Sequence, residues 1–107
     1  MMQGEYSVYL KDMIEALKLE NCTPDVDIDD IMITQNEVNR PALQLAGYFD
    51  YFDSSRIQII GHVEHTYMQQ KGMEHSVAMM ERIMAGSEDK GQPPCIVLSL
   101  QVHPQSV

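Results

Sequence analysis

Two apolar segments rich in β-branched residues, "RIQIIG" at residues 56–61 and "CIVLSL" at residues 95–100, enclose two segments of helical character. The first segment is typical of a strand that ends at Gly61, and the continuous apolar run of the second predicts a strand buried on both faces. Between them, residues 64–70 and residues 73–85 are predicted helices. Strands that alternate with helices favour an α/β fold, with a small mixed or largely parallel sheet flanked by helices.

The first third of the chain shows the same alternation. "YSVYL" at residues 6–10 predicts a short strand, and the apolar residues that follow are spaced by three and four positions, as one helix face requires. Those residues are Leu10, Met13, Ile14 and Leu17. Further on, "PDVDIDDIMI" at residues 24–33 alternates aspartates with apolar residues, which predicts a strand or hairpin with one face in water.

The longest predicted helix covers residues 73–85 and ends at Gly86. Its apolar residues recur at helical spacing and form one stripe. The stripe consists of Met73, Val77, Met80 and Met84. We interpret this stripe as a core face, with an adaptable binding groove as the alternative, because methionine serves both purposes.

A short helix is predicted within "NRPALQLAG" at residues 39–47. Asn39 is a suitable cap, Pro41 suits the start of a helix, and Gly47 can adopt the left-handed conformation that ends one. The helix therefore has fewer than two turns.

Four aromatic side chains follow this helix within five positions, although the whole chain has only seven. They are Tyr48, Phe49, Tyr51 and Phe52. Each such ring can bury about 150–250 Å², so we predict that the rings pack over the sheet edge as an anchoring wedge. The alternative is that one ring face stays open to stack on a ligand or a partner.

The stretch "NRPALQLAGYFDYFDSSRIQIIGHVEHTYM" resembles the N-terminal domain of bifunctional HPr kinase/phosphorylase, the bacterial regulator of carbon catabolite repression. The matching positions are Arg40, Pro41, Leu43, Leu45, Ala46, Gly47, Tyr48, Phe49, Tyr51, Phe52, Arg56, Ile57, Gln58, Gly61 and Glu64. The resemblance extends more weakly to "SVYLKDMIEALKLE" and "PPCIVLSLQVHP". The sequence departs from the family pattern at Ala42, where glycine is usual, and at Asp53, where proline is common.

This resemblance implies a single domain over residues 1–107, similar in fold to the N-terminal domains of HPr kinase and of a Mur ligase. It implies a regulatory or assembly role beside a C-terminal kinase/phosphorylase domain or subunits of the same family. Self-association and a small ligand stay open as further possibilities. The residues with a structural part in the motif are Pro41, Gly47, Phe49, Phe52 and Gly61.

The family's phosphate-binding loop, Gly-x-x-x-x-Gly-Lys-Ser/Thr, belongs to its C-terminal domain, and this sequence contains no such motif. The pairs Lys71-Gly72 and Lys90-Gly91 have the reverse order and lack the spaced partner glycine. We therefore expect no catalytic residue, no cofactor and no kinase or phosphorylase activity in these residues. An excised or split N-terminal domain is expected rather than a complete enzyme.

The charge of the chain argues against nucleic acid and anionic lipid as partners. Seven basic and sixteen acidic residues give a formal net charge of −9, which repels phosphate groups. The sequence has no apolar run of the roughly 20 residues that a membrane helix needs and starts without a secretory signal, which predicts a cytoplasmic protein. Cys22 and Cys95 lack the paired spacing of a metal or redox motif and are expected to be free thiols.

Two other functions compete with a regulatory domain. One is a stand-alone module that senses a small, nucleotide-like ligand. The other is a metal-dependent hydrolase that uses His62, Glu64 and His65 of "HVEH". A catalytic zinc site typically uses three protein ligands, and Gly61 indicates that His62 leaves a strand rather than joining a helix, so this second function has weak support.

Arg40 and Arg56 lie on either side of the aromatic motif and are predicted to form a local positive spot on an acidic chain. A guanidinium group suits a carboxylate or a phosphate, so both arginines are candidates for an interface or a ligand, together with Tyr48 and Tyr51. The alternative for each arginine is an ion pair with an acidic residue of the same domain.

Overall fold

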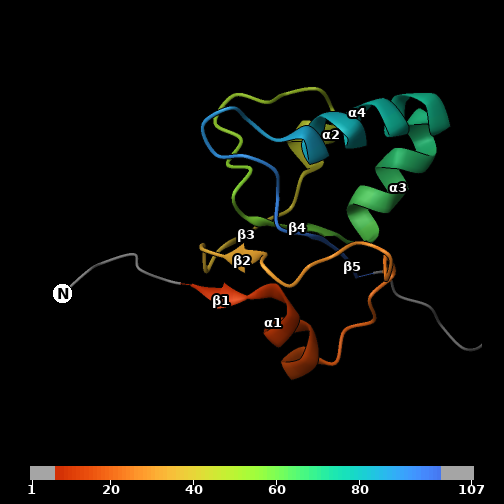
Figure 1. Cartoon of the computed structure of the whole chain (residues 1–107). Coiled ribbons are helices and arrows are strands. Elements are labelled where there is room, and N and C mark those ends of the chain that lie inside the picture. The colour runs from red at the N-terminus through yellow and green to blue at the C-terminus, as the bar shows by residue number, and fades with distance from the viewer. Residues whose placement is uncertain (1–6, 100–107) are drawn as a thin grey trace, which may run out of the picture.

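The computed structural model describes residues 7–99 and shows a mixed α/β arrangement (Figure 1). In chain order the elements are β1 (Val8–Tyr9), α1 (Leu10–Leu17), β2 (Met32–Ile33), β3 (Val38–Asn39), α2 (Ala42–Leu45), β4 (Ile57–Ile60), α3 (His62–Lys71), α4 (Met73–Ala85) and β5 (Ile96–Leu98). The predicted fold class is therefore confirmed.

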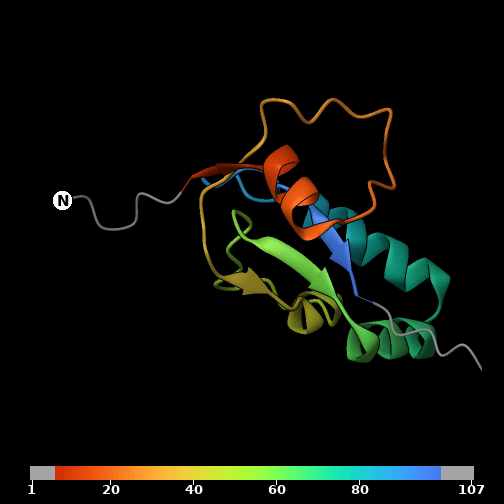
Figure 2. The ribbon, with the colours of Figure 1, turned by 90° about the horizontal axis from the view of Figure 1, so that it is seen from below.

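A three-stranded parallel sheet in the order β3-β4-β5 forms the centre of the fold, and β1 and β2 form a separate antiparallel pair. Helices α2, α3 and α4 lie on one side of the parallel sheet, whereas α1 lies on the other (Figures 1 and 2). The sheet thus separates two apolar layers.

The layer beside α1 holds a buried cluster of Leu10, Ile33 and Ile57. Ile59 of β4 and Val97 of β5 pack against this cluster. Because successive side chains of a strand point to opposite faces, the even-numbered residues of β4 and β5 point toward α2, α3 and α4.

Two predictions about strands are corrected, and one strand was not predicted. The strand or hairpin expected at residues 24–33 shrinks to β2, and the aspartates before it lie exposed in a loop. The periodicity did not indicate β3, which has only two residues. The strand expected at residues 95–100 is not buried on both faces, because β5 is an edge strand and Leu98 is exposed. Tyr6 and Leu100, which the predicted strands included, lie outside the described residues.

The helices largely agree with the predictions, with two corrections at their starts. Asn39 does not cap α2, because it belongs to β3 and its side chain binds two glutamines. His62 does not extend a strand, because α3 begins at this residue. Gly47 has a φ of +99° after α2, and α4 ends at Gly86 as expected.

The interpretation of the methionine stripe on α4 as a core face is wrong. Met73, Val77 and Met84 are exposed and Met80 is half-buried, whereas Ile83 is the fully buried residue of this helix. The stripe is not buried because α4 packs against α2 and α3 with its other face, which carries Ile83. The alternative, a groove, is described below.

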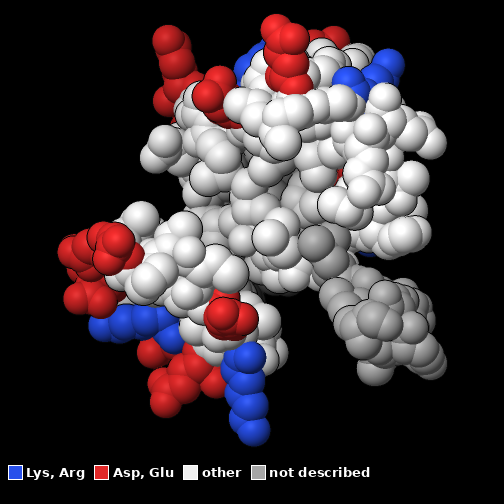
Figure 3. Space-filling model, turned by 90° about the vertical axis from the view of Figure 1, so that its right-hand side faces the viewer, with Lys and Arg blue, Asp and Glu red and all other residues white. Residues whose placement is uncertain are grey.

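Charged side chains are unevenly distributed over the face seen in Figure 3, which has a broad uncharged region between two charged margins. Within residues 7–99, no helix is both long and apolar enough to cross a membrane.

Candidate functional site

The residues Arg40, Gly61 and Glu64, which we call the β4–α3 junction, meet beyond the carboxyl ends of two parallel strands. Arg40 follows β3, Gly61 follows β4, and Glu64 lies in the first turn of α3. The carboxyl ends of the strands in open α/β sheets are the usual place for ligands. The β4–α3 junction is therefore the first candidate for a ligand-binding or catalytic site.

The carboxylate of Glu64 is the centre of the junction. Its Oε1 atom accepts a hydrogen bond of 2.9 Å from Nη2 of Arg40 and one of 2.8 Å from the backbone N–H of Gly61. The side chain of Glu64 is only 3% exposed, whereas that of Arg40 is 52% exposed. Glu64 thus caps its own helix, and Arg40 neutralises it from the solvent side.

Two opposing effects act on the pKa of Glu64. Burial by itself would raise the pKa, because it penalises the charged form. The hydrogen bonds from Arg40 and from the N–H of Gly61 favour the charged form and outweigh burial, so the pKa of Glu64 lies below its ordinary value. Glu64 is consequently ionised at neutral pH and poorly suited to donate a proton.

Gly61 is needed at the junction because of space rather than backbone conformation. Its φ of −108° is accessible to any residue. A Cβ atom at this position, however, would lie 2.5 Å from Nη2 of Arg40 and 3.3 Å from Oε1 of Glu64. A side chain here would therefore push Arg40 away from Glu64.

Beside the junction lies a network of three amide side chains that the sequence analysis missed, with Gln44 and Gln58 buried and Asn39 half-buried. Nδ2 of Asn39 donates to Oε1 of Gln44 at 3.0 Å and to Oε1 of Gln58 at 2.7 Å. Nε2 of Gln58 donates to the carbonyl of Arg56 at 3.0 Å. Nε2 of Gln44 donates to the carbonyl of Tyr48 at 3.3 Å, and the network as a whole joins β3, α2 and β4. A glutamine inside an isoleucine-rich strand was the available signal, because a buried amide requires polar partners.

Arg40 and Arg56 do not form one positive spot, which corrects the prediction. Arg56 precedes β4, where it lies 3.0 Å from Glu37 and 3.4 Å from Asp53. A strand of four residues separates it from the junction, a length of about 13 Å. Each arginine thus has an acidic partner within the domain, which was the alternative that the sequence analysis left open.

The aromatic motif is only partly a wedge. The rings of Phe49 and Phe52 meet edge to face with centroids 5.6 Å apart, and the guanidinium of Arg82 lies 3.9 Å from the centroid of Phe49. Both phenylalanines are half-buried. Tyr48 is exposed, and Tyr51 is 96% exposed with a φ of +64°. The turn around Tyr51 directs its ring to solvent, so two rings anchor the loop and two do not.

The geometry does not favour the metal-dependent hydrolase. Glu64 is committed to Arg40 and Gly61, and His62 is exposed while His65 is half-buried. Within residues 7–99, no group of three or more histidine, cysteine, aspartate or glutamate side chains is placed to hold a metal ion. The two cysteines are free, and burial raises the pKa of the Cys95 thiol.

Replacing Arg40 by glutamine should lower the free energy of unfolding at pH 7 by about 1–2 kcal/mol, because buried Glu64 loses a charged partner that is itself half-exposed. The folded-state pKa of Glu64 is lowered, so this contribution is complete above its unfolded pKa of about 4.3. It is lost as the pH falls through the folded-state pKa. Urea unfolding of both proteins over a pH series measures the difference.

The matched control is Lys71→Gln, which removes a cation from the end of α3, where the structure shows contact with the Tyr67 ring. Its effect should be a few tenths of a kcal/mol at every pH. Equal losses for Arg40→Gln and Lys71→Gln across the pH range would contradict the role given to Arg40.

Comparison with known proteins identifies relatives over almost the whole chain. An HPr kinase/phosphorylase from Lachnoclostridium phytofermentans is 53% identical over 92 residues, which cover 86% of this chain and 28% of that protein. Those from Clostridium acetobutylicum and Latilactobacillus sakei are 33% and 30% identical over 98 residues, which cover 92% of this chain and 30% of each protein. No solved structure matches.

The chain thus spans less than a third of the length of these relatives. Residues 8–107 match the family model described as HPr Serine kinase N terminus. The matched region includes the β4–α3 junction, the amide network and the aromatic motif. This chain therefore belongs to the HPr Serine kinase N-terminal family.

Proposed function

We propose that this chain is a non-catalytic regulatory and assembly domain of an HPr kinase/phosphorylase, a class of proteins that controls carbon catabolite repression in the cytoplasm. This proposal is supported by family membership taken together with a missing motif. The chain belongs to the N-terminal family, yet its sequence contains no Gly-x-x-x-x-Gly-Lys-Ser/Thr loop to bind the phosphates of a nucleotide.

The geometry of the β4–α3 junction supports a non-catalytic role. The carboxylate of Glu64 is held in its charged form by Arg40 and by the N–H of Gly61. A general acid or base works best with a pKa near the working pH. The pKa of Glu64 is lowered, which takes it further from neutral pH. The neighbouring amides bind one another. These groups hold three elements together.

The proposed partner is a C-terminal kinase/phosphorylase domain, or subunits of the same family. Among the candidate contact residues, Tyr48 and Tyr51 are the better placed, because both rings are exposed. Tyrosine is enriched at interfaces, where it supplies a large contact area and a polar hydroxyl group. Arg40 and Arg56 are weaker candidates, because each forms an ion pair with an acidic residue of this chain.

The test compares three proteins for transfer of labelled phosphate from ATP to HPr. They are this chain, the Lachnoclostridium phytofermentans relative, and a chimera in which this chain replaces the matching 92 residues of that relative. We expect transfer by the relative and by the chimera and none by the chain, which has no loop to hold the phosphates. Transfer by the chain above a no-protein background would overturn the proposal.

A regulatory role also predicts a difference when the domain is removed. The catalytic part of the relative alone should differ from the chimera in oligomer mass or in its dependence on ATP concentration. Identical mass and identical dependence would show that the domain neither assembles nor regulates the enzyme.

A further inference from the structure

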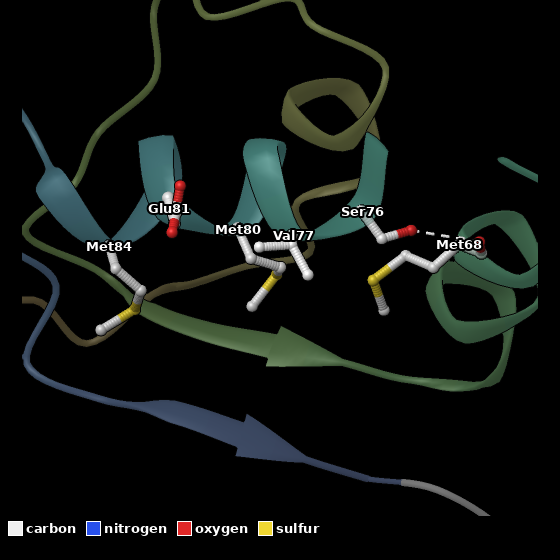
Figure 4. Close-up of a pocket in the computed structure, with 6 residues that line it drawn as sticks. All are labelled: Met68, Ser76, Val77, Met80, Glu81 and Met84. Carbon is white, nitrogen blue, oxygen red and sulfur yellow. Dashed lines mark hydrogen bonds between the residues drawn. The ribbon is translucent and has the colours of Figure 1, made fainter. Parts of the chain in front are cut away.

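A groove on α4 is lined in part by three residues of the predicted methionine stripe, of which Val77 and Met84 are exposed and Met80 is half-buried. Its lining is Met68 of α3 together with Ser76, Val77, Met80, Glu81 and Met84 of α4, and its volume is about 390 Å³. Figure 4 shows the methionine side chains pointing from the helices toward the strands β4 and β5. The lining contains one charged side chain, Glu81, so the groove suits an apolar occupant.

The edge of β5 beside this groove presents unpaired backbone groups. The N–H of Ser99 donates to the carbonyl of Ile60, and the N–H of Gln58 donates to the carbonyl of Cys95. The odd-numbered residues of β5 therefore direct their backbone groups toward β4. Backbone direction alternates along a strand, so the N–H and C=O groups of Ile96 and Leu98 point away from β4. Within residues 7–99, no strand pairs with this outer edge.

The side chains of the same two residues face the helices. Ile96 and Leu98 are in register with Gln58 and Ile60, which lie on the face opposite the α1 cluster. Leu98 is 60% exposed although Ile60 beside it is buried. Figure 2 shows α4 displaced toward the outer edge of β5, away from β4. The helix thus extends over a position where the sheet has no further strand among the described residues.

The surroundings of this edge also resemble an interface. The face in Figure 3, which looks onto the side of the molecule with α3 and α4, has few charged side chains in its central region. Depletion of charge and enrichment in methionine are typical of the centre of an interface. An exposed strand edge that lacks charge is normally covered in a native protein.

We propose that a β-strand from the part of the longer HPr kinase/phosphorylase that lies outside these residues adds to the outer edge of β5, beneath α4. Its backbone pairs with Ile96 and Leu98, and its apolar side chains on one face enter the α4 groove. This inference rests on the proposed function, because it requires that the chain is one part of a longer polypeptide.

Two arguments favour a strand of the same polypeptide over a second copy of this chain. The relatives are more than three times as long as the region that this chain matches, and a strand from the same polypeptide would be held at a higher effective concentration than a second copy. Two copies paired antiparallel through β5 would place both α4 helices on the same face at one shared edge. Packed helices need about 8–10 Å between their axes, and the two helices would compete for that space.

The experiment measures amide hydrogen exchange by mass spectrometry in the isolated chain and in the chimera with the Lachnoclostridium phytofermentans relative. Peptides that cover residues 95–99 should exchange at least about tenfold more slowly in the chimera, because the docked strand protects the amides of Ile96 and Leu98. β3, at the opposite edge of the sheet, is the internal control and should not change.

Substitutions distinguish docking at this edge from a general increase in stability. In the chimera, Leu98→Asp should remove the added protection because it places a charge under α4. Leu43→Asp is the matched control, since Leu43 on α2 is 61% exposed and lies away from the groove, and it should leave the protection unchanged.

Three results would overturn the inference. They are equal exchange of residues 95–99 in both proteins, protection in the isolated chain that rises with its concentration, and equal effects of the two aspartate substitutions. The second result would assign the edge to another copy of the chain. Phosphate transfer to HPr is recorded in the same chimera, so a chimera that transfers phosphate without protecting β5 rejects this inference and leaves the proposed function standing.

Discussion

Replacing Ile83 by alanine should lower the free energy of unfolding by about 2–5 kcal/mol, because the change removes buried methyl groups and leaves a cavity. Ile83 has no exposed surface and lies on the face of α4 that packs against α2 and α3. A domain of this size is commonly stable by only about 5–15 kcal/mol, so the loss is a large fraction of the total. Urea denaturation of the purified variant measures it.

The neighbouring residue supplies the control. Met84→Ala removes a side chain of similar size from the same helix, but Met84 lies exposed in the α4 groove. Its cost in the isolated chain should stay below about 1 kcal/mol. If Met84→Ala were as damaging as Ile83→Ala, the assignment of the two faces of α4 would be wrong.

Replacing Gly86 by alanine should cost about 3–5 kcal/mol, from backbone strain together with lost hydrogen bonds. Gly86 has a φ of +72° and a ψ of −153°, a conformation that is essentially restricted to glycine. A Cβ atom here would also lie 1.9 Å from the carbonyl oxygen of Gly91. That oxygen accepts hydrogen bonds from the N–H of Ser87 and from the buried hydroxyl of Ser54.

Gly72→Ala separates strain from collision. Gly72 has a φ of +92° and a ψ of 168°, so it carries similar backbone strain, but a Cβ atom there would meet nothing within 4 Å. Its cost should be about 1–2 kcal/mol, from strain alone. Thermal unfolding midpoints of the two variants give the comparison. Equal midpoints would show that the collision of the added Cβ atom with the carbonyl of Gly91 contributes nothing to the loss of stability.

The predicted elements were most reliable where a local signal was long. The helix at residues 73–85 was located correctly because its thirteen residues carry a sustained pattern and end at a glycine. By contrast, β3 has two residues, which is too short for any periodicity. The strand at residues 24–33 was overestimated because alternation of aspartates with apolar residues resembles a strand even in an exposed loop.

The candidate site was predicted less well than the fold. Arg40 and Glu64 both lay on the recognised motif, but no local pattern indicates that residues 24 positions apart bind each other. The network of Asn39, Gln44 and Gln58 was missed for the same reason. The two arginines seemed close because they flank one motif, yet β4 places them at opposite ends of the sheet.

The α/β class, the family and the lack of a phosphate-binding loop in these residues could all be predicted from the sequence, because each depends on residue types at fixed local spacing. Which apolar face of α4 is buried depends instead on packing, since Ile83 and the methionine stripe satisfy the same helical period and the position of α2 and α3 distinguishes them. The same holds for β5, whose apolar run is equally compatible with a central strand. Its exposed edge follows from the order of strands in the sheet, which depends on contacts between distant parts of the chain.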